Sequence, residues 1–243
     1  MIILFSGPDW DEKGEVLLVD KPLDWTSFDV VKKIRSLFHI KKVGHAGTLD
    51  PKATGLLILC TGAQTKSIGQ FVGFEKEYRG TMELGVKTPS HDSETEEIER
   101  QSASFVTADL LRSTAREILG KQRQVPPMYS AAKMGGRPLY RYARRGDTVE
   151  RTDKEIEIKE FEILRFDLPF VDFRVVCSKG TYIRSLSDDF GRKLGCGAVL
   201  RALRRTRIGP YNVENALTID QLIRARDDLR NRPPVPHEGH VSV

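Results

Sequence analysis

The segment that most constrains the fold is GHAGTLDPKATG, residues 44–55, because it combines three glycines with a single carboxylate, Asp50, and a proline directly after it. Glycine is used where the chain needs a positive φ or a close backbone approach, and proline holds the preceding residue in an extended conformation. We therefore predict a turn that gives Asp50 a defined orientation. Two interpretations stay open at this point: Asp50 caps a helix that begins at Pro51, or it is a positioned nucleophile or general base.

The composition favours a folded protein with a polyanionic partner. The 243 residues are 39% hydrophobic, which is enough for a sizeable core, and 39 Lys and Arg against 34 Asp and Glu give a net charge of +5. The sequence has neither a signal-peptide pattern nor an apolar run near 18 residues, so we predict a cytoplasmic protein outside the membrane. Cys60, Cys177 and Cys196 lie far apart without a Cys/His cluster, which favours reduced core thiols over a metal site.

Periodicity predicts mixed helices and strands in the first half of the chain. A short apolar strand is expected over residues 15–20, and Thr26 is expected to open an amphipathic helix through Phe38. The run 77–84 alternates as a strand that turns Tyr78 inward. Thr107 is expected to open a further helix.

The second half predicts an antiparallel pair of strands, residues 154–167 and 170–177, followed by a helix from about Tyr182 to Leu194. Arginines at 201, 204, 205 and 207 predict a second basic patch. Because helices and strands mix without strict βαβ alternation, we predict one mixed α/β (α+β) domain over residues 1–227 and a flexible tail over 228–243.

A basic lobe interrupts this domain at about residues 124–150. Prolines at its start and Gly135–Gly136 at its tip break regular structure. Basic and aromatic side chains then alternate, which fits phosphate contact combined with base stacking. The alternative is that this segment is a charged part of the surface that does not bind RNA, which would explain the same pattern. The interleaved residues are Arg137, Tyr140, Arg141, Tyr142, Arg144 and Arg145.

Five motifs in chain order resemble the TruB family of pseudouridine synthases, the bacterial tRNA pseudouridine-55 synthases. They are residues 44–55, KEYR at 76–79, PMYSA at 127–131, CSKGTYIR at 177–184 and LGCGA at 194–198. The resemblance implies a pseudouridine synthase catalytic fold with a central, largely antiparallel sheet flanked by helices, and the basic lobe as its thumb. It also implies an isomerase that acts on the T-arm of tRNA, with no metal, no organic cofactor and no obligate protein partner.

The resemblance gives roles to individual residues. It implies that Asp50 attacks C6 of the base or C1′ of the ribose, or abstracts a ribose proton to give a glycal, and these three routes stay open. Tyr78 is implied to stack on a flipped base and is a candidate for removing the C5 proton, while Arg184 is implied to pair with Asp50. Tyr182 and Leu203 are implied to line the base pocket, and His45 to enter the space that the base leaves.

For RNA contacts outside the pocket we predict Arg137, Arg141, Arg144 and Arg205. The chain departs from the family at Thr88–Asp92, where Pro89 replaces the first aspartate of a Thr-Asp-Thr pattern, and it is expected to lack the C-terminal PUA domain that many members carry. Two alternatives to a tRNA synthase remain: a non-catalytic RNA-binding or tRNA-folding module, and a synthase for another RNA.

Overall fold

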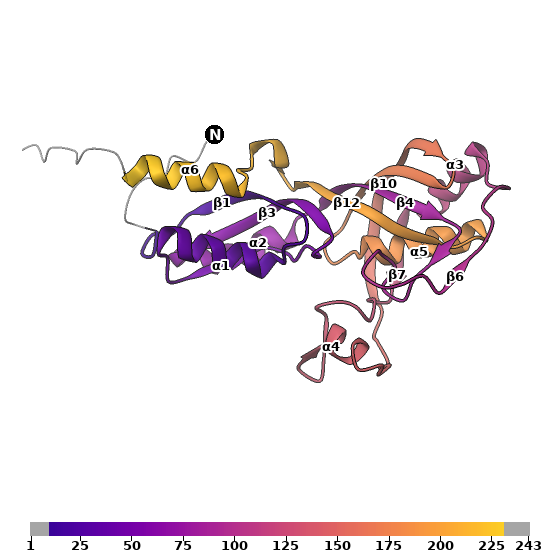
Figure 1. Ribbon diagram of the computed structural model, residues 1–243, viewed down its shortest axis with the longest axis horizontal. Coiled ribbons are helices and arrows are strands. Elements are labelled where there is room, and N and C mark those ends of the chain that lie inside the picture. The colour runs from indigo at the N-terminus through magenta and orange to yellow at the C-terminus, as the bar shows by residue number, and fades with distance from the viewer. Residues whose placement is uncertain (1–9, 231–243) are drawn as a thin grey trace, which may run out of the picture.

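A computed structural model describes residues 10–230 of the chain, and Figure 1 shows an elongated molecule with a small lobe set apart from its main body. The helices are α1 (Ser27–Phe38), α2 (Ile68–Gly73), α3 (Ala108–Glu117), α4 (Leu139–Ala143), α5 (Ile183–Leu194) and α6 (Ile219–Arg230), with 3₁₀ helices at Gly62–Ser67 and Val213–Asn215. The strands are β1 (Val16–Lys21), β2 (Val43–His45), β3 (Ala53–Thr61), β4 (Lys76–Leu84), β5 (Val86–Lys87), β6 (Glu99–Arg100), β7 (Gly120–Gln124), β8 (Lys133–Met134), β9 (Arg137–Pro138), β10 (Lys154–Asp167), β11 (Phe170–Cys177), β12 (Ala198–Ile208) and β13 (Tyr211–Asn212).

One nine-stranded sheet runs through the whole body, in the order β1-β3-β12-β4-β11-β10-β7, with β2 on β3 and β13 on β12. All its pairs are antiparallel except β3 with β12, which is parallel. The predicted α+β class and largely antiparallel sheet are thus confirmed. β12 crosses the middle of the molecule and joins a first half, built on β1 and β3, to a second half built on β4, β11 and β10 (Figure 1).

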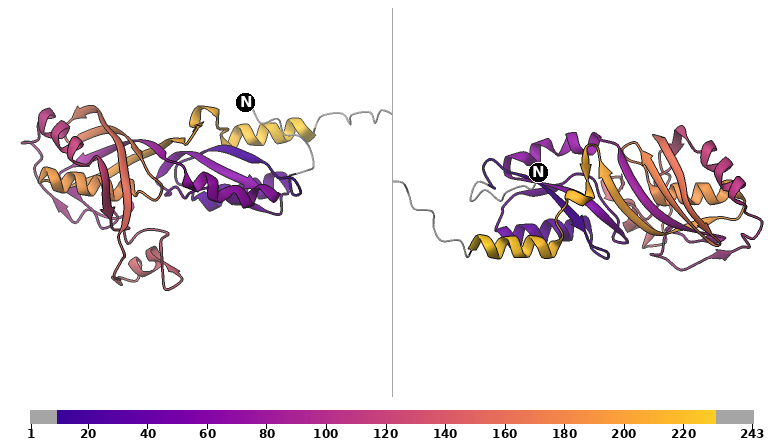
Figure 2. Two further views of the ribbon diagram at one scale, coloured as in Figure 1. Left: turned by 180° about the vertical axis from the view of Figure 1, so that it is seen from behind. Right: turned by 90° about the horizontal axis from the view of Figure 1, so that it is seen from above.

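Helices cover both faces of the first half. α1 and α6 pack on one face of β1 and β3, and α2 packs on the other (Figure 2). Thr26 opens α1 as predicted, because its hydroxyl accepts the backbone N–H of Asp29 and the Asp29 carboxylate accepts the N–H of Thr26. The apolar residues of α1 that were predicted from helical spacing are buried at Val30, Val31, Ile34 and Leu37.

The second half buries only one face of the sheet. α3 and α5 cover the face that carries Tyr78, Met82 and Phe173. The opposite face carries charged pairs such as Arg174 with Glu77, an arrangement that antiparallel sheets allow when one side meets water. Cys177 and Cys196 lie in this core and Cys60 in the first half, all three as free buried thiols, as the sequence predicted.

The predicted basic lobe is a separate excursion between β7 and β10, built from β8, β9 and α4 (Figure 1). We call residues 125–153 the thumb. The structure excludes one of the two interpretations of Asp50 and corrects the start of the predicted tail. No helix begins at Pro51, because two turn residues lead directly into β3 and Asp50 caps nothing. The predicted tail starts too early, since residues 228–230 belong to α6, and its remainder at 231–243 lies outside the described residues.

Gly55 shows why residues 44–55 need glycine. It has a φ of +104°, and a Cβ atom at this position would lie 2.3 Å from the carbonyl oxygen of Arg205. We expect Gly55→Ala to lower the free energy of unfolding by at least about 1–3 kcal/mol from backbone strain alone. Thermal or urea unfolding measures this. Gly69→Ala in α2, where a Cβ meets nothing within 4 Å, is the matched control and should not destabilise the protein.

Candidate active site

Asp50 is held from both sides by residues between the end of β1 and the start of α1. Ser27 Oγ accepts the backbone N–H of Leu49 at 2.8 Å, and the carbonyl of Pro51 accepts the N–H of Asp24 at 2.9 Å. The ammonium of Lys21, which is 0% exposed, donates to the carbonyls of Pro22 and Trp25 at 2.8 and 2.6 Å. The backbone on both sides of Asp50 is therefore fixed.

Arg184 joins two carboxylates at the base of the site. Its Nε lies 2.8 Å from Oδ2 of Asp50 and 3.5 Å from Oδ2 of Asp92, with no hydrogen-bond alignment to either. The outer nitrogens of the guanidinium donate to the carbonyls of Ser90 and Tyr129 at 3.2 and 2.8 Å. Arg184 and Asp92 are nearly buried, whereas 36% of the Asp50 side chain remains exposed. Asp50 is thus the member of this cluster that a ligand can reach.

Burial sets the protonation of the groups around Asp50. It raises the pKa of Asp50, a shift that the Arg184 guanidinium opposes and the Asp92 carboxylate reinforces. Burial also lowers the pKa of Lys21 to about 8, against the attraction of Asp50. The Asp50 carboxylate is therefore less well solvated than an exposed one, and the Arg184 guanidinium beside it favours its charged form.

A cavity of 340 Å³ opens in front of Asp50, and it collects the residues that the resemblance assigned to a base pocket. Tyr78, Tyr182 and Leu203 line it together with Asp50. Gln124 positions Tyr182, since its side-chain amide accepts the N–H of Tyr182 at 2.8 Å and donates to its carbonyl at 3.1 Å. Burial raises the pKa of Tyr78, so its phenol stays protonated at neutral pH.

Arg205 does not face the solvent, and the prediction that it contacts RNA phosphates is wrong. Its side chain is 1% exposed and donates to the carbonyls of Leu56 at 2.7 Å, Gly47 at 3.2 Å and Thr48 at 3.5 Å. Arg205 therefore ties the glycine-rich loop to β3 and supports Asp50 from below.

The predicted second basic patch is also wrong, because carboxylates neutralise its other arginines. Exposed strands with alternating charges form such cross-strand pairs. The pairs are Arg201 with Glu83 and Glu97, Arg204 with Asp20, and Arg207 with Glu75 and Glu77.

His45 lies in a second cavity of 450 Å³, which shares Thr48, Leu49 and Asp50 with the first. Burial lowers the pKa of His45, so its ring is neutral at neutral pH. Arg144 of the thumb lines the same cavity and pairs with Glu94 at 3.6 Å. The other two predicted thumb contacts, Arg137 and Arg141, are exposed and line a 220 Å³ hollow with Tyr142 and Arg145.

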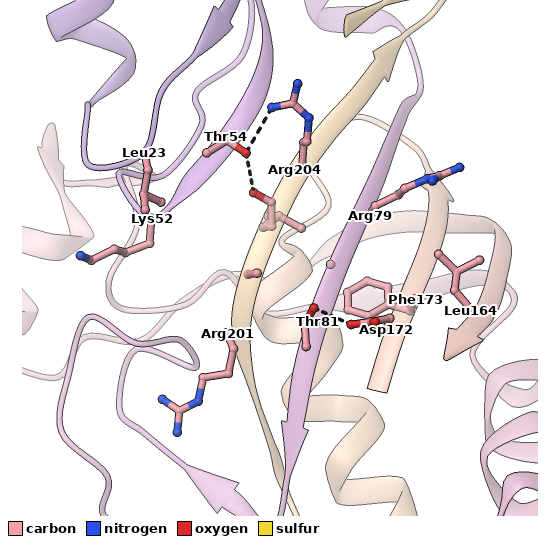
Figure 3. A pocket seen from close by; sticks show the side chains of 13 residues that line it. Leu23, Lys52, Thr54, Arg79, Thr81, Leu164, Asp172, Phe173, Arg201 and Arg204 are labelled. Carbon is pink, nitrogen blue, oxygen red and sulfur yellow. Dashed lines mark hydrogen bonds between the residues drawn. The ribbon is translucent and has the colours of Figure 1, made fainter. Parts of the chain in front are cut away.

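A larger cavity of 550 Å³ lies among β4, β11 and β12 and also has Lys52 and Thr54 in its wall, but Asp50 does not line it (Figure 3). Two of its polar groups have partners: Thr81 donates to Asp172 at 2.6 Å, and Arg204 is paired with Asp20. This cavity lacks a carboxylate with the exposure and cationic partner of Asp50. Size therefore does not identify the reactive centre.

Sequence reasoning missed two residues of the site. Lys21 directly follows the strand expected over residues 15–20, and no local pattern indicates that its ammonium is buried, while Asp92 stands in the sequence only as the end of the stretch that contains Pro89. The signal for Asp92 was present, since an aspartate remains at the end of Thr88–Asp92 despite Pro89. Within residues 10–230, no three His, Cys, Asp or Glu side chains gather as a metal site, and no helix has the length and apolar character that a membrane crossing needs.

Comparison with known families and sequences gives a consistent result. The model described as "TruB family pseudouridylate synthase (N terminal domain)" matches residues 35–183, and that of the "tRNA pseudouridylate synthase B C-terminal domain" matches residues 184–232. Proteins named tRNA pseudouridine synthase B are 49% identical in Chloroherpeton thalassium, over 86% of this chain and 89% of the relative, and 49% identical in Flavobacterium johnsoniae, over 85% and 93%. The relative of that name in Burkholderia pseudomallei is 45% identical over 94% and 75%.

Solved structures with the same fold come from larger proteins. The archaeal box H/ACA sRNP Nop10-Cbf5 complex contains a chain that aligns with a TM-score of 0.65 and 28% identity, over 89% of this chain. A Cbf5-Nop10-Gar1 complex aligns with a TM-score of 0.66 and 29% identity over 87%. This chain spans 55% and 58% of the length of those two matched chains.

Proposed function

The chain belongs to the TruB family of pseudouridylate synthases and isomerises uridine to pseudouridine in tRNA, and we propose that it acts through Asp50 on the uridine at position 55 of the T-loop. The observation that carries the proposal is the partly exposed Asp50 carboxylate, held 2.8 Å from Arg184 at the edge of a cavity lined by Tyr78, Tyr182 and Leu203. From the tRNA substrate we also infer a cytoplasmic location.

The reaction breaks the bond between N1 and C1′ and forms one between C5 and C1′. The proton lost from C5 is balanced by one gained at N1, so no atom enters or leaves. Attack of Asp50 on C6, its attack on C1′ and proton abstraction from the ribose all begin with an ionised carboxylate, which Arg184 keeps charged and oriented. Tyr78 and Leu203 hold the base during its rotation, and stacking on the Tyr78 ring offsets the cost of flipping it out of the RNA.

The direct test uses a T-arm stem–loop transcript incubated with the protein and mapped chemically for pseudouridine. We expect one modified position, the T-loop uridine, and no modification in a transcript with cytidine there. A transcript that binds but stays unmodified would favour the non-catalytic RNA-binding alternative. Modification of unrelated hairpins at equal rates would favour another RNA as substrate.

Acid pH should inhibit the enzyme earlier than an ordinary aspartate predicts. Because burial raises the pKa of Asp50, protonation removes the reactive carboxylate at a pH above the usual 3.8. We expect single-turnover rates to fall as pH decreases, with a midpoint above that value. An acid limb centred at or below 3.8 in an enzyme that circular dichroism shows to be folded would contradict the assignment.

The thumb arginines should control the salt dependence of binding. If exposed Arg141 contacts a phosphate, Arg141→Gln should weaken T-arm binding and reduce the slope of log K against log salt by about one unit. Arg165→Gln is the control, because Arg165 is 69% exposed and pairs with Asp167 outside the thumb. If the wild type, Arg141→Gln and Arg165→Gln all gave the same salt slope, Arg141 would be an ordinary surface residue that contacts no phosphate.

A further inference from the structure

The 550 Å³ cavity of Figure 3 lies on the opposite face of the sheet from the Tyr78 cavity. Successive side chains of a strand point to opposite faces, so Tyr78 of β4 enters the core beneath α5, whereas Arg79 and Thr81 face the water-exposed side. The volume of the cavity lies within the range of about 300–1,000 Å³ that is typical of small-ligand pockets. The proposed reaction does not use this space, so an occupant would have a separate role.

Three arginines lie side by side across this face of the sheet. Arg204, Arg79 and Arg174 are register partners on β12, β4 and β11. Like charges that lie directly opposite one another destabilise a sheet. The outer two arginines have a counter-charge, since Arg204 pairs with Asp20 at 2.6 Å. Arg174 pairs with Glu77 at 2.7 Å. Arg79 stands between them, exposed, and forms no ion pair with any residue that the structure describes. It therefore lacks an anion that its two neighbours have.

Apolar side chains, and no carboxylate, accompany Arg79 at the edge of the cavity. The same face of β10 carries Glu160 and Glu162, both of which pair with the arginine of β11. Leu164 follows them on that strand, is 44% exposed and lies on the same side of the cavity as Arg79 (Figure 3). Leu23, which is 53% exposed, lines the cavity as well. A ligand here would meet a cation beside apolar surface that suits a flat ring.

One carboxylate does line the cavity, and it favours a nucleotide over a bare anion. Asp172 accepts the hydroxyl of Thr81 at 2.6 Å, and its two oxygens leave capacity for a further donor such as a ribose hydroxyl or a base amino group. Its register partner Thr81 is two residues along β4 from Arg79, and such diagonal neighbours lie about 7–8 Å apart in a sheet. A nucleotide carries its phosphate and its donor groups at a comparable separation.

We propose that this cavity is a second nucleotide-binding site, in which Arg79 binds the phosphate and Asp172 accepts a hydrogen bond from the sugar or the base. Arginine suits this role because its planar fork of donors matches a phosphate group. The nucleotide belongs either to the tRNA outside its T-arm or to the free nucleotide pool, and both present the same chemistry. Because the sheet separates this site from the Tyr78 cavity, both can be occupied together. The inference does not depend on the proposed function.

Arg79→Gln is the variant that tests the phosphate contact. If the nucleotide belongs to tRNA, this change should weaken binding of a full-length tRNA transcript by about 10- to 150-fold, the loss expected for a hydrogen bond to a charged group. Binding of the isolated T-arm stem–loop, and pseudouridine formation in it, should stay at the wild-type level. Fluorescence anisotropy measures both affinities.

Adenosine 5′-monophosphate tests the free nucleotide. It is titrated by calorimetry into wild-type protein already saturated with the T-arm stem–loop, which keeps the probe out of the Tyr78 cavity. Arg79→Gln should weaken this binding by about the same factor. Pseudouridine formation by the wild type is measured separately, so a failure of the proposed function would not be mistaken for a failure of this site.

Two further substitutions control for charge and for place. Arg112→Gln removes the same charge from α3 on the other face of the sheet, where Arg112 is 64% exposed and pairs with Asp109, and it should bind like the wild type. Leu164→Asp puts a carboxylate into the cavity and should reproduce the loss, because like charges repel. Leu164→Asn, which is neutral, should bind more tightly than Leu164→Asp.

The outcomes separate the two sources of the nucleotide. A loss confined to full-length tRNA would assign the site to RNA outside the T-arm, and a loss confined to adenosine 5′-monophosphate would assign it to a free nucleotide. Wild-type affinity of Arg79→Gln for both probes would overturn the inference, as would an equal loss in Arg112→Gln. A loss in Arg79→Gln without one in Leu164→Asp would place the anion outside the cavity and overturn it too.

Discussion

Asp50→Asn is expected to abolish pseudouridine formation, with a rate loss on the order of 10⁴-fold or more. An amide neither attacks carbon nor accepts a proton as a carboxylate does, so all three routes open to Asp50 fail together. Binding of the T-arm should persist, because the thumb and the rings around the cavity are unchanged. Single-turnover assays with excess protein measure the rate, and fluorescence anisotropy measures binding.

The fold of the Asp50→Asn variant should survive. Burial raises the pKa of Asp50 in the folded chain, so the folded state favours the neutral carboxyl group. The stability that this group contributes is fully present below its pKa in the unfolded chain, and it is lost as the pH rises through its pKa in the folded chain. At neutral pH the amide variant should therefore melt no lower than the wild type. Wild-type turnover by a folded variant would remove Asp50 from the mechanism.

Arg184→Lys is expected to reduce the rate by about 10²–10³-fold although the charge is kept. The guanidinium reaches Asp50 and Asp92 with Nε while its outer nitrogens bind the carbonyls of Ser90 and Tyr129. A single ammonium group cannot occupy these positions together, so Asp50 loses its orientation. Some stability should also be lost, since breaking a buried ion pair costs about 3–5 kcal/mol when one partner is removed outright.

Arg192→Lys provides the comparison on the same helix. Arg192 is 61% exposed and pairs with Asp188 and Asp189 on α5, away from Asp50, so its replacement should leave the rate near that of the wild type. Asp92→Asn should give a smaller loss than Arg184→Lys, because Arg184 keeps its contact with Asp50. Equal rates for the two lysine variants would show that Arg184 contributes nothing beyond its charge.

Local patterns in the sequence predicted most of the fold. The cap at Thr26, the inward face of β4 and the β10–β11 pair follow from spacing within a few residues, and each is present in the structure. The resemblance, carried by five motifs in order, grouped Asp50, Tyr78, Tyr182 and Leu203 around one pocket with Arg184 beside Asp50. In the structure these four residues line one cavity, and Arg184 lies next to Asp50. Their catalytic roles stay predictions until the variants are made.

Local patterns could not predict which side chains contact one another when they lie far apart in the sequence. Four arginines in β12 look alike in a sequence, but Arg205 points into the protein while the other three pair with carboxylates from other segments of the chain. Asp92 and Arg184 likewise meet only because a loop folds against α5. Counting charges in a sequence cannot distinguish a paired or buried arginine from a free one. For this reason the prediction of a second basic patch was wrong.

The parallel seam between β3 and β12 bears on when the enzyme becomes active during its synthesis. Residues 53–55 pair there with residues 203–205, so the support of Asp50 by Arg205 closes one of the longest loops in the chain. Contacts of such high sequence separation carry a large loop-closure entropy and slow folding, and this one requires residue 205 to have been synthesised. A chain still emerging from the ribosome therefore cannot hold Asp50 in place, and modification of tRNA waits until nearly the whole domain has been made.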